Sequence, residues 1–288
     1  MVEKILLENG QEMSVDFFIT PVIGVGGSGS VILHEENNKK YAIKKPKKVK
    51  DAERENAIAR IISGKHNAFP IYTFPMHNDV VITDYIPDRT LKYYCREHQV
   101  HRNVRRCMLY KLCQGIHEMH VVHHIVHRDI KPENILVKIH NKNVLNFDVA
   151  ETMSMSDILQ GVSVIIIDWA YSLILPLEVG ASYDASGSPS YISPEMLIGK
   201  NYDPLFAHDI WSLGVTIYML ATGHRPYEAT KMSVLAIRQN RFLDNLENTL
   251  QAKIIDVQLQ DLLMKLFVAD PKYRITIQEV IIHPYLSF

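Results

Sequence analysis

Two neighbouring segments near the N-terminus carry residue types that suit phosphate binding. Gly24-Val25-Gly26-Gly27-Ser28-Gly29-Ser30-Val31 satisfies the pattern G-x-G-x-x-G-x-V. Glycines let a hairpin come so close to a ligand that backbone N–H groups reach phosphate oxygens. The loop precedes a predicted strand rather than opening a helix, which argues against a dinucleotide-binding fingerprint. No Gly-Lys-Ser/Thr ends the loop, which argues against a P-loop.

The second segment is Tyr41-Ala42-Ile43-Lys44, on the strand predicted to follow. A lysine that alternates with apolar neighbours points one cation into the cleft, where it can hold phosphates. The alternative is an ordinary surface lysine, because the run Lys39–Lys50 is rich in lysine. That run could also form a nucleic-acid patch, but a solvated strand edge explains it better. Only the adjacent glycine loop favours phosphate binding by Lys44.

A third segment identifies a family. His127-Arg128-Asp129-Ile130-Lys131-Pro132-Glu133-Asn134-Ile135-Leu136 is nearly a full match to the catalytic loop of eukaryotic protein kinases. The chain resembles a serine/threonine protein kinase essentially from end to end. Lys131, two residues after Asp129, is typical of the serine/threonine type.

Further segments match the same family. Asp168-Trp169-Ala170 stands where the family usually has Asp-Phe-Gly, and Gly187–Glu195 resembles the segment that closes the activation loop. Asp209–Gly214 resembles the helix that braces the catalytic loop, and Arg274 matches the arginine that pairs with Glu195. His283–Leu286 resembles the last helix, so we expect one kinase domain without a regulatory tail.

The resemblance implies a role for each matching residue, with ATP and Mg²⁺ as cofactors. Asp129 would orient the substrate hydroxyl and accept its proton, and Lys131 would neutralise the moving phosphoryl group. Asn134 and Asp168 would hold Mg²⁺. Lys44 would grip the α- and β-phosphates of ATP.

The resemblance also implies how the rest of the nucleotide site is built. An acid on the helix predicted over Asp51–Ile62 would hold Lys44; we prefer Glu55, with Glu53 as the alternative, since the spacing from Lys44 is short for the family. Thr83 would control access to a back pocket, and its small size predicts that this pocket is open. The remaining contacts to the nucleotide would come from Gly24, Gly26, Gly27, Ser28, Gly29, Val31, Ala42, Asp84, Ile86 and Leu136.

The elements that must position these residues divide into two kinds. Short β-branched runs at Phe17–Ile23, Val31–His34, Lys40–Lys44 and Val80–Asp84 predict strands, and mostly helical patterns follow from Leu91 onward. We therefore predict an α+β, bilobal kinase fold with a small β-rich lobe containing one helix and a larger helical lobe. The predicted boundaries are 1–288 for one domain, 1–83 for the N-lobe, 84–91 for the hinge and 92–288 for the C-lobe.

Composition excludes several other classes of protein. The chain of 288 residues has 47% hydrophobic residues, 31 basic against 32 acidic residues and a net charge of −1, so we expect no direct binding of nucleic acid. Its three cysteines form no CxxC pair, which favours a reducing, intracellular compartment. Neither a signal peptide nor a membrane span is indicated. The expected partners are ATP and a protein substrate with a serine or threonine acceptor, basic proteins being candidates. The sequence leaves the oligomeric state open.

The chain departs from the family pattern in three places. Asn134 and Asp168 are 34 residues apart, which indicates an insertion at about 138–161, predicted as a polar surface loop. Trp169-Ala170 should flip out of the site less readily than Phe-Gly, because alanine resists positive φ by roughly 1 kcal/mol. Asp184 stands where many relatives carry a phosphorylated residue, so it could pair with Arg128 without phosphorylation; alternatively Ser182 or Ser186 is modified.

Two other functions compete with an active protein kinase. A pseudokinase would keep the fold as a binding module, and a small-molecule phosphotransferase would use a similar fold. Lys44, Asp129, Asn134 and Asp168 oppose the first, and the peptide-platform segments Gly187–Glu195 and Asp209–Gly214 oppose the second. Among kinases, the glycine loop and Asp168-Trp169-Ala170 resemble the baculovirus late protein kinases, which implies late action in the cytoplasm or nucleus of infected insect cells.

Overall fold

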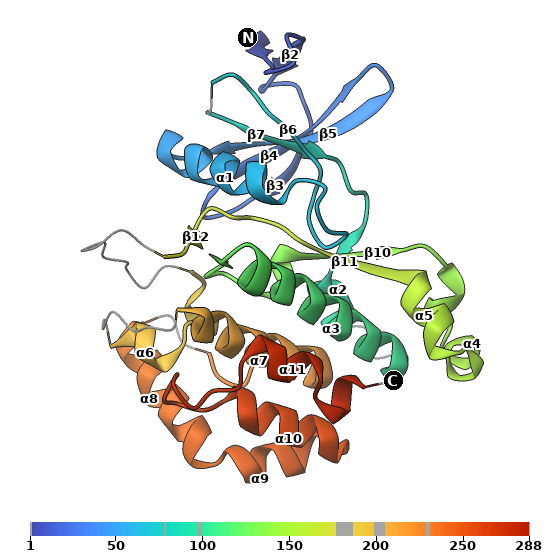
Figure 1. The fold of residues 1–288 in the computed structure, drawn as a ribbon, viewed down its shortest axis with the longest axis vertical. Helices are drawn as coiled ribbons and strands as arrows, with labels where there is room; N and C mark the ends of the chain where they lie inside the picture. Colours follow the sequence, from blue (N-terminus) through green and yellow to red (C-terminus); the bar gives the residue numbers. More distant parts are fainter. Residues whose placement is uncertain are drawn as a thin grey trace.

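The computed structural model describes residues 2–77, 79–96, 100–176, 187–198, 205–228 and 231–287. Figure 1 shows a β-rich lobe, in blue, above a larger helical lobe coloured from green to red. The chain passes from one lobe to the other between Asp84 and Leu91. This arrangement confirms the predicted α+β, bilobal architecture.

The smaller lobe is built on a five-stranded antiparallel sheet in the order β3-β4-β5-β7-β6. Its strands are β3 (Val22–Val25), β4 (Gly29–Glu36), β5 (Lys39–Pro46), β6 (Tyr72–Thr73) and β7 (Val81–Asp84). The β3–β4 connection carries the glycine loop, and β5 carries Lys44. One helix, α1 (Val49–Ile62), lies against β5 and β7, and its buried residues Ala52, Ile58, Ala59 and Ile62 join the main core of the molecule.

A hairpin that the sequence patterns did not indicate precedes this sheet. It consists of β1 (Val2–Leu6) and β2 (Glu12–Asp16), and its inward side chains join a small core with the sheet. The strand predicted over Phe17–Ile23 is wrong over its first half, where the chain turns. The Asp16 carboxylate accepts a hydrogen bond from the Phe18 N–H at 3.0 Å, and this local bond favours a turn over a strand.

The larger lobe is mainly helical and packs around α7, most of which is buried. Besides the two helices of the insertion described below, its helices are α2 (Leu91–Arg96), α3 (Arg102–His117), α6 (Pro194–Leu197), α7 (Phe206–Thr222), α8 (Met232–Asp244), α9 (Leu246–Lys253), α10 (Val257–Leu266) and α11 (Ile277–Ile281). Within the described ranges, no helix has both the length and the apolar character needed to cross a bilayer.

Short strands at the top of the larger lobe carry the catalytic-loop segment. β8 (Arg89–Thr90), β10 (Ile135–Ile139) and β11 (Val162–Ile166) form one sheet, and β9 (Ile125–Val126) pairs with β12 (Leu173–Ile174) in another. The loop between β9 and β10 contains Asp129, and Asp168 follows β11 closely. Figure 1 places this region directly beneath the β-rich lobe.

The insertion is folded, so the prediction of a polar surface loop is wrong. It forms the 3₁₀ turn Lys142–Leu145, α4 (Phe147–Thr152) and α5 (Met155–Gly161) between β10 and β11. Asn146 and Ser154 cap the two helices by accepting hydrogen bonds from Val149 N–H and Asp157 N–H. Its apolar residues Val144, Ala150 and Ile158 are fully buried in the main core. These three side chains tie a mainly polar segment to the larger lobe.

Candidate active site

Both carboxylate oxygens of Asp129 are engaged by neighbouring groups. Oδ1 accepts a hydrogen bond from the Ser188 N–H at 2.8 Å. Oδ2 lies 2.6 Å from Lys131 Nζ and accepts a hydrogen bond from Asn134 Nδ2 at 2.9 Å. Asp129 is only 2% exposed. The structure thus brings Asp129, Lys131 and Asn134 together and holds the carboxylate in one orientation.

The backbone before Asp129 is held by a buried acid on α7. Asp209 accepts hydrogen bonds from the His127 N–H at 2.7 Å and the Arg128 N–H at 2.8 Å, and lies 3.0 Å from His120 Nε2. Burial raises the pKa of Asp209, but the hydrogen bond from His120 and nearby histidine charges outweigh it, so the net pKa is lowered. An ionised Asp209 therefore stabilises Arg128, whose φ of 65° is unusual for a residue other than glycine.

Lys44 connects the two lobes through two carboxylates. Its Nζ hydrogen-bonds Glu55 on α1 and lies 2.6 Å from Asp168 Oδ1, on the segment after β11. Glu53, the alternative left open by the sequence, is exposed on the other side of α1. The register of the helix therefore brings Glu55 to Lys44.

These three charges shift one another's pKa values in different directions. Burial raises the pKa of Glu55 to about 7, against the lowering effect of Lys44. Burial lowers the pKa of Lys44, but the two carboxylates outweigh this effect and raise it. Burial likewise raises the pKa of Asp168, and Lys44 more than reverses that shift. Because one cation serves two acids, Asp168 stays ionised and Glu55 is the acid that titrates near neutral pH.

The glycine loop folds over this cluster. The Gly26 N–H donates to the Gly29 carbonyl at 2.9 Å, and Ser28 Oγ donates to Asp168 Oδ2 at 3.2 Å. A Cβ on Gly29 would lie 2.4 Å from the Lys45 carbonyl oxygen, so only glycine fits there. A Cβ on Gly26 or Gly27 would meet no atom within 4 Å. The tip of the loop is thus open on the side where phosphates would approach.

The remaining residues predicted to contact the nucleotide lie on both lobes. Ala42 pairs with Thr83 across β5 and β7, and Val31 pairs with Lys44 across β4 and β5. Leu136 lies on β10 in the larger lobe. The Asp84 N–H donates a hydrogen bond to the Ile71 carbonyl at 3.0 Å, so of its two backbone groups only the Asp84 carbonyl is available to a ligand. The Ile86 N–H makes no backbone hydrogen bond to any described residue and can therefore donate to one.

The space beside Thr83 is occupied by an aromatic ring. Tyr72 pairs directly with Thr83 across β6 and β7, so the two side chains lie on the same face of the sheet. Tyr72 is buried, and its charge interactions with Glu55 and Asp168 place it behind the Lys44 cluster. The small size of Thr83 therefore does not by itself create the open back pocket expected from the sequence.

The donor atoms near Lys44 suit a hard divalent cation. Asn134 uses its Nδ2 to bind Asp129, which leaves its amide oxygen available, and Asp168 is an ionised carboxylate. Among the residues that the structure describes, no three His, Cys, Asp or Glu side chains cluster as a metal site. Mg²⁺ typically takes one or two protein oxygens and completes its shell with water and phosphates, so these residues fit it.

Comparison with known families agrees with this geometry. The family profile described as "Protein kinase domain" matches residues 17–286. The chain belongs to the protein kinase family.

The two relatives described here are named as protein kinases, and one of them as a probable serine/threonine kinase. The probable serine/threonine-protein kinase KCC4 of Saccharomyces cerevisiae is 31% identical over 57% of this chain and 13% of its own length. The SNF1-related protein kinase catalytic subunit alpha KIN12 of Arabidopsis thaliana is 26% identical over 94% of this chain and 51% of its own length. This kinase therefore spans about half or less of these relatives.

A solved structure supports the fold. The Rad53 kinase domain, in a crystal structure described as that domain and SCD2, superposes with a TM-score of 0.68 and covers 94% of this kinase and 89% of that chain. Sequence identity is 20%, so this likeness concerns the fold alone.

Ser188 is a site residue to which sequence reasoning assigned no role. Its N–H binds Asp129, and its Oγ accepts a hydrogen bond from Lys131 Nζ at 2.7 Å. Gly187, with a φ of 113°, makes this approach possible, since a Cβ there would lie 2.5 Å from the Arg128 carbonyl. The sequence signal was the Gly187–Glu195 segment, but only the fold shows that it reaches Asp129.

The same segment is anchored to the core of the kinase by a buried ion pair. Arg274 binds both carboxylate oxygens of Glu195, at 2.7 and 2.9 Å, and its Nη1 also donates to the Ala207 carbonyl. This contact is the pairing that the sequence predicted. Asp184, Ser182 and Ser186 lie outside the described residues.

Trp169 fills the apolar position next to the site. It is fully buried, with its ring 5.8 Å from that of Phe69 and 4.8 Å from that of His127. Arg54 on α1 donates to the Ala170 carbonyl at 2.8 Å. Ala170 is not among the residues with positive φ, so alanine is unstrained in this state. Asp168 therefore points into the site with its two successors packed behind it.

Proposed function

We propose that this protein is a serine/threonine protein kinase that transfers the γ-phosphoryl group of ATP to serine or threonine hydroxyls of proteins. The observation that carries the proposal is the joint arrangement of Asp129, Lys131, Asn134 and Ser188 below the cluster of Lys44 and Asp168. An acid that can orient a hydroxyl thus lies near cations that can hold phosphates.

The side chains divide the work of the reaction. The substrate hydroxyl oxygen attacks the γ-phosphorus, the bond from that phosphorus to the departing ADP oxygen breaks, and Asp129 accepts the hydroxyl proton. Lys131, 2.6 Å from Asp129, neutralises charge on the moving phosphoryl group. Lys44 holds the phosphates of ATP, and Asn134 and Asp168 would hold Mg²⁺. When bound, Mg²⁺ would neutralise the charge that develops between the β- and γ-phosphates.

The test is a labelling assay with an inactive control. The purified chain is incubated with Mg²⁺, labelled ATP and a set of serine- and threonine-containing proteins, including a basic one such as protamine, beside the Asp129→Asn variant. Labelling of serine or threonine by the wild type alone is the expected result. ATP binding without any labelling would instead identify a pseudokinase, and labelling of small molecules only would identify a small-molecule phosphotransferase.

We further propose that the kinase is a baculovirus late protein kinase acting in the cytoplasm or nucleus of infected cells. Support comes from the glycine loop and from Asp168-Trp169-Ala170 in the sequence. The two curated relatives described above come from a yeast and a plant, so this finer placement rests on those motifs. Its test is the time course of the transcript and the protein in infected insect cells; expression without infection would refute it.

A further inference from the structure

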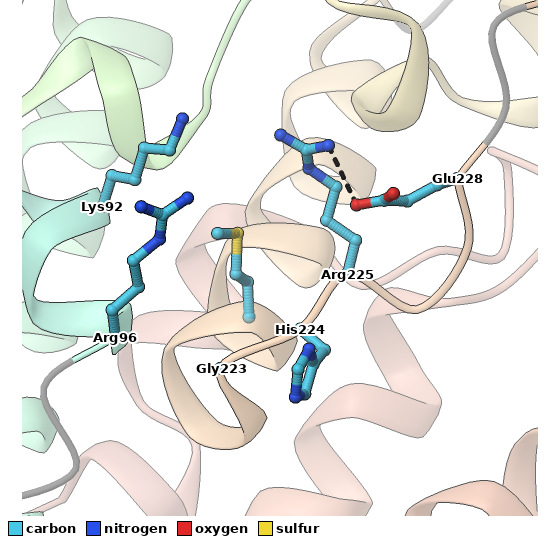
Figure 2. A pocket seen from close by; sticks show the side chains of 7 residues that line it. Lys92, Arg96, Gly223, His224, Arg225 and Glu228 are labelled. Carbon is cyan, nitrogen blue, oxygen red and sulfur yellow. Dashed lines mark hydrogen bonds and ion pairs between the residues drawn. The ribbon is translucent and has the colours of Figure 1, made fainter.

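A basic cavity opens on the larger lobe between the end of α2 and the turn after α7. Its volume is 530 Å³, and its polar lining residues are Lys92, Arg96, His224, Arg225 and Glu228. Figure 2 shows Lys92 and Arg96 on one side of the cavity and Arg225, paired with Glu228, on the other. Met219 also lines the cavity. None of these residues has a role in the site described above.

Positive charge exceeds negative charge in this cavity. Lys92 lies 2.8 Å from Glu133, and Arg225 lies 3.0 Å from Glu228 and 3.7 Å from Glu133. Arg96 is exposed and makes no ion pair or hydrogen bond with any other described residue. Three permanent cations thus face two carboxylates, in a chain whose net charge is −1. The surplus is therefore local to the cavity.

Arg225 has a hydrogen-bond donor to which no described residue is bound. Its Nε is buried and has no hydrogen-bond partner within the described residues. Its guanidinium group lies 5.7 Å from the centre of the Tyr191 ring. An Nε–H that is buried without a hydrogen-bond partner costs stability. An anion can supply the missing partner, because a guanidinium group binds two oxygens of one phosphate or carboxylate through two parallel hydrogen bonds.

The cavity borders both segments that hold Asp129. Glu133, which contacts Lys92 and Arg225, belongs to the 3₁₀ turn Pro132–Asn134 of the catalytic loop. Tyr191, beneath Arg225, donates its N–H to the carbonyl of Ser188 at 2.9 Å, and Ser188 binds Asp129. A peptide with its acceptor hydroxyl at Asp129 and about 3.3 Å of chain per residue reaches the cavity within a few residues.

We propose that this cavity binds an anionic side chain of the protein substrate, a phosphoserine or an acidic residue, a few positions from the acceptor. The inference rests on the proposed kinase function and gives its substrate class. Arg96, Lys92 and Arg225 would bind the anion, with Arg96 contributing the charge that has no partner in the described residues. A basic protein would suit this cavity only where an anionic residue lies beside its acceptor.

The first test compares peptides that differ at one position. Serine peptides carrying alanine, aspartate, phosphoserine or lysine at each of the five positions on either side of the acceptor are phosphorylated by the full chain. We expect phosphoserine or aspartate at one position to raise kcat/KM at least about tenfold over alanine, and the stronger of the two identifies the anion. Arg96→Glu removes this preference. The control Lys253→Glu, an equal charge change on the exposed face of α9, retains it. A wild type without preference for an anion would overturn the inference.

A binding experiment separates this inference from the proposed catalysis. Each phosphopeptide of the set, with its acceptor serine replaced by alanine, is titrated with wild type and Arg96→Glu and followed by fluorescence anisotropy. If no peptide is labelled but binding depends on Arg96, the cavity stands and the proposed catalysis fails. If wild type and Arg96→Glu bind the phosphopeptide equally well, the cavity assignment is overturned. Labelling of the alanine-flanked peptide would still support the proposed kinase activity in that case. Inorganic phosphate is added as a competitor. If it displaces the phosphopeptide and binds with equal affinity, the cavity is a site for a free anion, and its role in substrate choice is overturned.

Discussion

Lys44 Nζ lies 2.6 Å from Asp168 Oδ1, although the two residues belong to different lobes. The same ammonium group binds Glu55, so α1, the sheet of the smaller lobe and the segment after β11 are connected through one cation. Ser28 of the glycine loop adds a third contact to this cluster through Asp168. The position of α1 and the position of Asp168 are therefore coupled through Lys44.

The pKa of Glu55 predicts a pH dependence of kinase activity. Burial raises it to about 7, so below that pH Glu55 is protonated and holds Lys44 less well. We expect kcat/KM for ATP to rise with pH and level off above about 7, and to be roughly tenfold lower one pH unit below the midpoint. Initial rates between about pH 5.5 and 8.5 measure this. Glu55→Gln should lower the plateau and remove the inflection; an inflection that persists in this variant contradicts the assignment.

The same shift predicts the direction of a stability change. The folded-state pKa of Glu55 lies above its ordinary value of 4.5, so the folded protein binds this proton more tightly than the unfolded chain. The contribution of Glu55 to the free energy of unfolding therefore falls as pH rises from about 4.5 towards 7. Urea unfolding at pH 5 and at pH 8 measures this. Between pH 5 and pH 8, the free energy of unfolding should fall more for the wild type than for Glu55→Gln.

Two glycines of the glycine loop should differ in their effects on stability and on ATP binding. Gly29→Ala places a Cβ 2.4 Å from the Lys45 carbonyl oxygen, which belongs to the paired strand and cannot move aside. We expect this variant to lose about 1–3 kcal/mol of stability by thermal unfolding. Gly27→Ala meets no protein atom within 4 Å, so its stability should be unchanged while its KM for ATP rises. Equal melting temperatures for the two variants would refute this distinction.

The types of the main site residues could be predicted from sequence, because their motifs are contiguous. Asp129, Lys131 and Asn134 lie in one loop, and Lys44 follows the glycine loop closely. The choice of Glu55 over Glu53 needed the register of α1 against the sheet. The role of Ser188 could be found only from the fold, which brings this residue from a distant segment into contact with Asp129. Such contacts depend on tertiary packing, which local patterns do not encode.

The basic cavity and the insertion illustrate the same limit. Arg96 and Arg225 belong to elements far apart in the sequence, so neither suggested a common site. Within the insertion, Val144, Ala150 and Ile158 are scattered among polar residues, and no regular period marks them as core. The turn after Asp16 shows the converse case, in which one side-chain hydrogen bond overrides a β-favouring run.

Ile158 tests whether the insertion is part of the folded core. The side chain is fully buried in the core that also contains α3, so Ile158→Ala removes apolar contacts and leaves a cavity. We expect a loss of about 2–5 kcal/mol in the free energy of unfolding. Leu145→Ala, at a 41% exposed position of the same insertion, is the matched control and should change stability by less than about 0.5 kcal/mol. Equal effects would mean that α5 does not contribute to the core.

Ser188 should support catalysis through its hydroxyl group. Ser188→Ala keeps the N–H that binds Asp129 but removes the 2.7 Å contact with Lys131. A hydrogen bond to a charged group contributes about 1.5–3 kcal/mol, so we expect kcat to fall by about tenfold or more while the KM for ATP is unchanged. Ser188→Thr retains the hydroxyl and most of the rate. Steady-state kinetics with one peptide measure all three proteins, and an unaltered kcat in Ser188→Ala would exclude a role for this hydroxyl.

Ala170 should restrain movement of Asp168 out of the site. Trp169 is enclosed by Phe69 and His127, and Arg54 holds the Ala170 carbonyl, so leaving this state breaks several contacts. Alanine also resists the positive φ values that a flipped backbone can require, by roughly 1 kcal/mol relative to glycine. We expect Ala170→Gly to bind an inhibitor specific for the Asp168-out state about fivefold more tightly than the wild type, with unchanged affinity for an inhibitor that binds only at adenine. Calorimetric titration of both proteins with both compounds measures the difference. Tight binding of the Asp168-out inhibitor to the wild type would show that Trp169 and Ala170 do not restrain this segment.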